Sequence, residues 1–178
     1  LIVLIAACGF LLLKSPPYVA PSASSAAAAP SWLLRLRWIF LAAVPSGLLI
    51  AVTAHISTDV AAAPLLWVLP LSLYLLTFVL VFRDRALIPR PLLLTLHLVA
   101  VAFALLQLSQ TRHDGWFISA AAGTAAFFTS AMVAHRTLYE SRPAPQHLTE
   151  FYLWMSLGGG LGGLFAGLVA PQVFSEVF

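Results

Sequence analysis

Long apolar stretches alternate with short polar segments along most of the chain. Five of these stretches hold 18 to 20 residues each. An α-helix rises about 1.5 Å per residue, so each stretch is long enough to cross the roughly 30 Å hydrocarbon layer of a membrane. The pattern therefore predicts five membrane-spanning helices, at residues 38–56, 64–82, 91–108, 116–134 and 151–170.

The chain begins with LIVLIAACGFLLLK, in which 13 apolar positions precede Lys14. This run is too short to span a membrane, and it lacks the basic start of a signal peptide. We expect it, at residues 1–13, to be the end of a transmembrane helix that begins outside the sequence, so that the chain is a fragment. Residues 14–33 are rich in Pro, Ala and Ser and predict a flexible cytoplasmic linker, which leaves residues 34–178 for a five-span bundle.

The composition agrees with a chain that lies in lipid. Hydrophobic residues make up 61% of the sequence and charged residues 8%, whereas soluble domains carry about 25% charged residues. We therefore predict an all-α fold, a polytopic transmembrane helix bundle with the bilayer as its main partner. The single cysteine, Cys8, excludes an intrachain disulfide and a cysteine-rich metal site.

The basic residues are distributed unevenly over the two sides of this predicted bundle. If each span crosses once, eight of the nine fall on one side: Lys14, Arg35, Arg37, Arg83, Arg85, Arg90, Arg136 and Arg142. The other side receives Arg112 alone. This asymmetry predicts that the basic loops are cytoplasmic and that both chain ends lie on the outer side. It also explains the basic isoelectric point, near 9.5, without a nucleic-acid partner.

Residues 151–167, FYLWMSLGGGLGGLFAG, fit two patterns. Gly158, Gly160 and Gly163 match the G-x-G-x-x-G fingerprint of dinucleotide-binding loops, but the flanking apolar spans leave no room for the strands that this fingerprint requires. Small residues that recur at helical spacing instead predict a face where another helix can come close. This predicted face consists of Ser156, Gly159, Gly160, Gly163 and Gly167. We expect no cofactor in this chain.

The fourth span carries a second stripe of small residues, namely Ser119, Gly123, Ala126 and Ser130. These positions share one side of a helix. We expect the stripe to pair with the glycine face of the fifth span, because a short connection joins the two antiparallel helices. The alternative is that its small polar groups line a path for a substrate.

Three further polar residues lie within or beside apolar stretches. His55 and Asp59 have the spacing that places side chains on one face of a helix, and they could bind a metal or relay a proton. Two ligands are too few for a typical zinc site, however, and Asp59 also suits a cap for the second span. His97, inside the third span, is either a buried hydrogen-bonding residue or a proton carrier.

The segment between the fourth and fifth spans is denser in polar groups than a simple connection requires. It contains His135, Arg136, Glu140, Arg142, His147 and Glu150. The alternatives are a solvated loop with salt bridges and a site for an anionic ligand, a lipid head group or a neighbouring domain. The sequence shows no Ser/His/Asp arrangement, phosphate-binding loop or pair of catalytic carboxylates, so we predict no catalytic centre here.

Residues 41–82 and 142–174 resemble the membrane portion of bacterial spermidine synthase-like proteins. The most distinctive parts are the Pro-Leu-Leu-Trp and His-Leu-Thr-Glu-Phe-Tyr segments, at residues 64–67 and 147–152. Members of this family join transmembrane helices to a C-terminal domain like that of polyamine aminopropyltransferases. The resemblance implies that any aminopropyl transfer belongs to that domain, so no catalytic residue carries over to this chain.

Three hypotheses for function follow. The chain serves as the membrane anchor or substrate conduit of a spermidine synthase-like protein in a bacterial inner membrane, or it is a non-catalytic subunit that packs against other helices of a larger complex. The third hypothesis is a small-solute transporter, with His55, Asp59 and His97 along its path.

Overall fold

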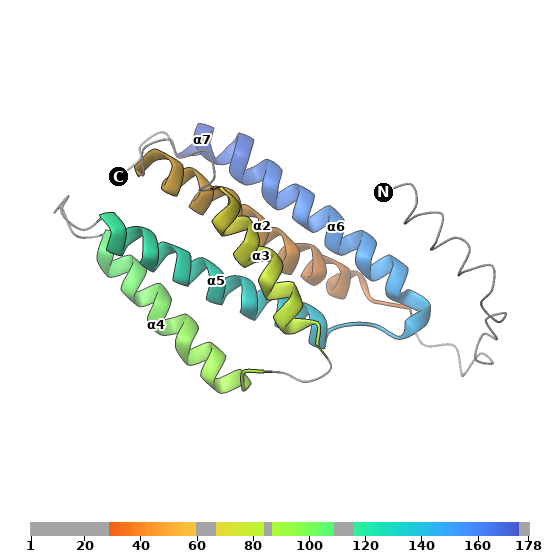
Figure 1. Ribbon diagram of the computed structural model, residues 1–178. Helices are drawn as coiled ribbons and strands as arrows, with labels where there is room; N and C mark the ends of the chain where they lie inside the picture. Colours follow the sequence, from red (N-terminus) through yellow and green to blue (C-terminus); the bar gives the residue numbers. More distant parts are fainter. Residues whose placement is uncertain (1–28, 60–66, 84–86, 109–115, 175–178) are drawn as a thin grey trace, which may run out of the picture.

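The computed structural model describes residues 29–59, 67–83, 87–108 and 116–174, and all regular structure in these ranges is helical (Figure 1). The main helices are α2 (Trp32–Asp59), α3 (Val68–Val81), α4 (Arg90–Leu108), α5 (Trp116–Glu140) and α6 (Leu148–Leu164). A 3-10 turn at Pro145–His147 precedes α6, and a π-helical turn at Phe165–Val169 joins it to the short α7 (Ala170–Val173). The predicted all-α fold is confirmed.

Four of the helical segments are long and apolar enough to cross a membrane. These segments are Trp32–Ser57, Arg90–Gln107, Phe117–Glu140 and Pro145–Val173. The span expected at residues 64–82 is not among them: the helix described there is the 14-residue α3, which at about 21 Å is shorter than the roughly 30 Å hydrocarbon layer. The partial helix expected at residues 1–13 and most of the linker expected at 14–33 lie outside the described residues.

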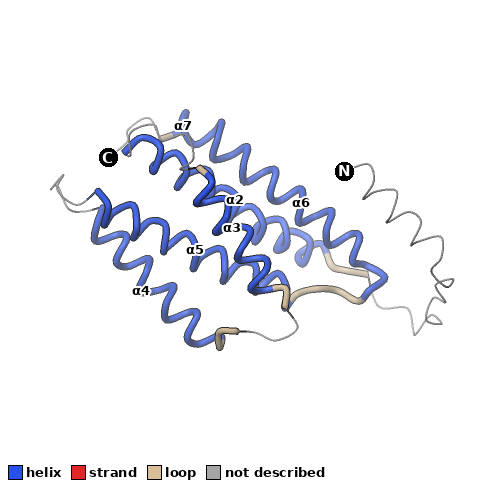
Figure 2. Tube along the Cα trace, viewed as in Figure 1, coloured by secondary structure: helices blue, strands red, loops and turns tan. Residues whose placement is uncertain are grey.

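The helices lie side by side in a bundle (Figures 1 and 2). Helix α2 packs between α6 and α5, and α4 packs against the far side of α5. Helix α3 contacts both α2 and α5. The order α6–α2–α5–α4 therefore forms a row, in which the described residues cover each of the two outer helices on one side only.

Two hydrophobic clusters form the described core. The first joins α2, α5 and α6 through Trp38, Leu138 and Phe151, and the second joins α3, α4 and α5 through Val81, Leu93 and Met132. The helices are also apolar on their outward faces, where the exposed large side chains include Val79, Leu98, Leu153 and Leu168. Helices that are hydrophobic all round are typical of proteins that lie in lipid or against other helices.

Candidate functional site

Every charged side chain that the structure describes lies at one end of the bundle, which we call the charged end. It contains the start of α2, α4 and α6 and the end of α3 and α5 (Figure 1). Its charged residues are Arg35, Arg37, Arg83, Arg90, Arg136, Glu140, Arg142 and Glu150. This gathering agrees with the predicted separation of charges, while the cytoplasmic location of this end stays a prediction.

An ion pair and an aromatic contact join α2 to α6 at the charged end. The Arg35 guanidinium lies 2.6 Å from the Glu150 carboxylate, and both side chains are mostly buried. The indole N–H of Trp154 donates to the same carboxylate at 3.2 Å. One turn further in, the fully buried rings of Trp38 and Phe151 meet edge to face, 5.1 Å apart. The His-Leu-Thr-Glu-Phe-Tyr segment therefore forms the junction between these two helices.

Glycines let α6 approach the backbone of α2. A Cβ atom added at Gly158 would lie 2.8 Å from Ile39 Cα, and one added at Gly162 would lie 2.7 Å from Ala43 Cα. Both distances are shorter than carbon atoms tolerate, so only glycine fits at either position. The Ser46 hydroxyl donates to the carbonyl oxygen of Gly159 at 2.8 Å across the same contact. This close packing is the type that small residues permit between helices in lipid.

The predicted pairing of the two small-residue faces is wrong, because the backbone of α6 packs against α2 and, within the described residues, does not come close to that of α5. Ser156 is exposed, and Gly159, Gly160 and Gly167 have open space where a Cβ atom would lie. A Cβ atom added at Gly163 would make ordinary contact with Ile50 and Ser46. The close approach thus falls on Gly158 and Gly162, which the predicted face did not include.

The small residues of α5 do not pack against the glycines of α6, contrary to the prediction. Gly123 has open space at its Cβ position, and Ser119 is half-buried. The Ser130 hydroxyl donates to the Ala126 carbonyl oxygen at 2.6 Å, and it lies 3.4 Å from Nδ1 of His97 on α4. Thr129 Oγ1 lies 3.5 Å from the same nitrogen. His97 is therefore placed as a polar contact between α4 and α5.

His55 and Asp59 occupy the last turns of α2. His55 is half-buried, whereas the side chain of Asp59 lies outside the described residues. Within the described ranges, no group of three or more His, Cys, Asp or Glu side chains is arranged to hold a metal ion. The roles considered for this pair stay predictions.

His135 lies inside the bundle and not in a polar loop, because α5 continues to Glu140. Its ring is fully buried, with Nδ1 2.7 Å from Thr77 Oγ1 and the ring centre 3.9 Å from that of Phe78. The Thr77 hydroxyl also lies 2.6 Å from the Tyr74 carbonyl oxygen, to which it donates. With that hydrogen engaged, the Nδ1–H of His135 donates to Thr77. The sequence analysis did not identify Thr77 as a partner, because it lies 58 residues from His135 in the chain.

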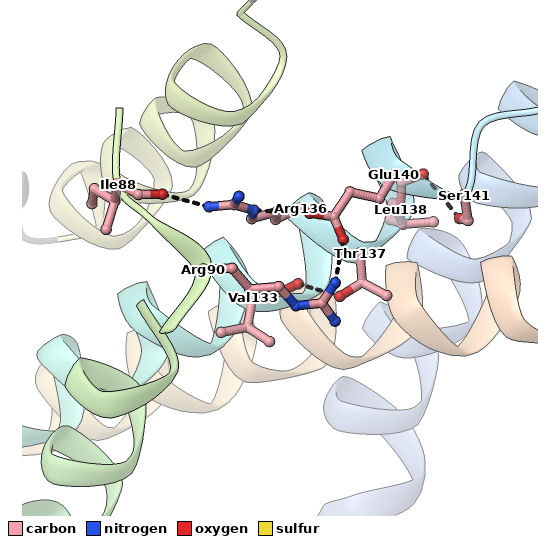
Figure 3. Close-up of polar contacts among 8 residues, drawn as sticks. All are labelled: Ile88, Arg90, Val133, Arg136, Thr137, Leu138, Glu140 and Ser141. Carbon is pink, nitrogen blue, oxygen red and sulfur yellow. Dashed lines mark hydrogen bonds and ion pairs between the residues drawn. The ribbon is translucent and has the colours of Figure 1, made fainter. Parts of the chain in front are cut away.

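The remaining residues of the polar segment form a network around Glu140 (Figure 3). One carboxylate oxygen of Glu140 lies 3.0 Å from Arg136 Nε, and the other lies 2.7 Å from Arg90 Nη1. Arg136 also donates to the carbonyl oxygen of Ile88, just before α4. Arg142 stacks on the Tyr139 ring, 3.7 Å from its centre. These contacts tie the end of α5 to the start of α4.

Two cavities flank Glu140. The first, of about 310 Å³, has an apolar wall that includes Leu80, Val81 and Met132 and a polar rim that includes Arg83, Arg136 and Tyr139. The second, of about 410 Å³, is open and is lined by Arg37, Arg90 and Arg142 among others. His147 and Glu150 lie on a different, shallow surface by the start of α6. The predicted polar segment is thus divided between separate places.

Comparison with known proteins gives no match to a protein-family model, to a curated protein or to a solved structure. What the fold itself establishes is a helical protein with four candidate membrane spans, which implies contact with a lipid bilayer in a multi-pass arrangement.

Proposed function

We propose that this chain is the membrane-embedded portion of a spermidine synthase-like protein in a bacterial inner membrane and that it serves as the anchor of a soluble domain. The observation that carries the proposal is the separation of surfaces: the sides of the bundle are apolar, and the described charges lie at one end. A bundle with such sides is stable in lipid, and its charged end remains in contact with water.

The residues behind the family resemblance support the proposal through their structural roles. Glu150 and Phe151 belong to the His-Leu-Thr-Glu-Phe-Tyr segment and join α6 to α2. The glycines that follow in the same resembling segment let the two backbones approach. Of the Pro-Leu-Leu-Trp segment, only Trp67 is among the described residues. The segments that resemble the family thus include residues that join two helices in this chain, and they are not only generally hydrophobic.

Anchoring is a better fit than conduction. A conduit needs polar groups that follow one another across the membrane, as transporters and proton relays have. His97 lies between α4 and α5, whereas His135 lies between α3 and α5 among aromatic rings. His55 belongs to α2, near the end opposite the charged end. These three histidines therefore lie in separate parts of the bundle.

Intact-mass spectrometry tests the anchor proposal on protein purified gently from its native membrane. We expect a polypeptide much heavier than the 19.1 kDa of this chain, and we expect the purified protein to transfer an aminopropyl group to a polyamine acceptor. A 19.1 kDa protein that purifies alone would contradict the proposal. So would a heavier protein whose additional domain does not bind a nucleoside cofactor.

A second candidate function is that of an accessory subunit in a larger membrane complex. The observation that favours it is the side of α6 that no other described helix covers, where Ser156 and Gly160 are exposed and Gly160 and Gly167 have open space at the Cβ position. Such a surface can receive a further helix. This hypothesis predicts a mass near 19.1 kDa together with stoichiometric partner chains, and it predicts that Gly160→Leu releases those partners.

A further inference from the structure

The surroundings of Glu140 carry an excess of positive charge. The two cavities beside it are lined by Arg83 and Arg136 on one side and by Arg37, Arg90 and Arg142 on the other. Glu140 is the only acid among the described residues that line these cavities. Among the described residues, five arginines and one carboxylate therefore line the two cavities, and an anion would be attracted to this part of the charged end.

The contacts inside the network leave donors for such an anion. Both carboxylate oxygens of Glu140 are engaged, one by Arg136 and one by Arg90. Arg136 has five N–H groups, of which one points to Glu140 and one to the Ile88 carbonyl oxygen. Its other N–H groups are free of described partners, and Arg83 is exposed on the rim of the same cavity. Guanidinium groups bind phosphate through paired hydrogen bonds.

The shape and position of the first cavity indicate which anion fits. Leu80, Val81 and Met132 give it an apolar wall directly beside the arginines. It lies at the last turns of α3 and α5, where the apolar helices give way to the polar segments. In a bilayer this is the level at which the phosphate of a lipid meets its acyl chains. A free phosphate ion has no apolar group that could pack against this wall.

We propose that this cavity binds an anionic phospholipid, with the phosphate held by Arg83 and Arg136 and an acyl chain packed on Leu80, Val81 and Met132. Basic pockets between helices at the cytoplasmic side of a membrane are known to accept anionic head groups. The proposal rests on the membrane location inferred above but not on the family resemblance. It gives Arg136 a second role beside its contacts with Glu140 and Ile88, because a phosphate held by Arg83 and Arg136 would join the end of α3 to the end of α5.

Native mass spectrometry of the full chain in detergent tests this proposal with two defined lipids of equal chain length, phosphatidylglycerol and phosphatidylcholine. We expect phosphatidylglycerol to be retained preferentially. Arg83→Gln should lower that preference about five-fold, which is the effect expected of one arginine near a membrane surface. Arg83 is exposed, so this change should leave the unfolding midpoint unaltered. Arg37→Gln is the matched control, because it removes the same charge from the same end but outside the cavity.

The lipid-retention experiment has three outcomes that would contradict the account. Equal retention of the two lipids, or equal losses in Arg83→Gln and Arg37→Gln, would overturn the proposal. Displacement of phosphatidylglycerol by millimolar inorganic phosphate would show that the site recognises phosphate alone, and it would also overturn the lipid assignment. A chain that stays soluble without detergent and retains neither lipid would instead contradict the membrane location itself.

Discussion

Helix α6 lies against the backbone of α2, whereas α4 meets α5 through long side chains. In the first contact, Gly158 and Gly162 remove the side chains that would separate the helices. In the second, Leu93 packs with Met132, and His97 reaches toward α5. Backbone contact leaves no atom that can move aside, but a side-chain contact can repack. The two sides of the bundle should therefore respond differently to substitution.

The largest effect is expected where a side chain would enter the α2–α6 contact. Gly162→Leu places carbon atoms against the Ala43 backbone and should destabilise the bundle by about 3 kcal/mol or more, because overpacking here cannot be relieved by a rotamer change. Unfolding of the purified protein in mixed detergent micelles, followed by tryptophan fluorescence, measures this loss. Gly160→Leu is the control: its Cβ position is open, so stability should stay within about 0.5 kcal/mol of the parent protein.

A smaller loss is expected from the ion pair at the end of the same contact. Glu150→Gln keeps the size of the side chain but removes the charge opposite Arg35, and the mostly buried pair should lose about 1 to 2 kcal/mol. A double-mutant cycle with Arg35→Gln, read by the same unfolding measurement, isolates the interaction. Losses that simply add would show that the two charges do not stabilise each other.

The α4–α5 contact should tolerate the loss of its polar group. His97→Leu preserves most of the volume and removes weak hydrogen bonds of 3.4 to 3.5 Å, so the expected destabilisation is about 0.5 kcal/mol. The unfolding midpoint measures it, with Thr129→Val as the matched change on the partner helix. A loss as large as that of Gly162→Leu would remove the distinction between the two contacts.

The smallest effect is expected at the start of α4. The Arg90 side chain is 58% exposed, so its ion pair with Glu140 is screened by solvent. Arg90→Gln should change stability by less than about 0.5 kcal/mol, and the change should shrink further when the unfolding measurement is repeated at high salt. A salt-independent loss above 1 kcal/mol would show that this pair contributes more than its exposure suggests.

The sequence was sufficient to predict the helices because their stabilisation in lipid depends on local properties. Apolar length and polar interruptions located α2, α4, α5 and α6, and the basic residues indicated which ends meet. These features can be read one segment at a time, since each helix satisfies its own backbone hydrogen bonds.

The partner of the glycine helix was not predictable in the same way. Glycines at 158, 159, 160, 162 and 163 produce several overlapping stripes at helical spacing, and only one of them can face a given neighbour. The deciding feature lies on the other helix, where Ala43 and Gly47 provide a complementary small-residue face. The contact of Thr77 with His135 likewise joins residues distant in sequence. Such pairings depend on tertiary packing.

Site-directed labelling with a membrane-impermeant maleimide tests most directly that the chain crosses the membrane with its charged end in the cytoplasm. Cys8 is first replaced by serine, and one new cysteine is then introduced at a time. The two variants are Gln146→Cys at the charged end and Phe174→Cys just after α7, and both of these residues are exposed. We predict that in intact cells Phe174→Cys is labelled, whereas Gln146→Cys is labelled only after permeabilisation. Labelling of Gln146→Cys in intact cells, or equal labelling of the two variants, would contradict the account.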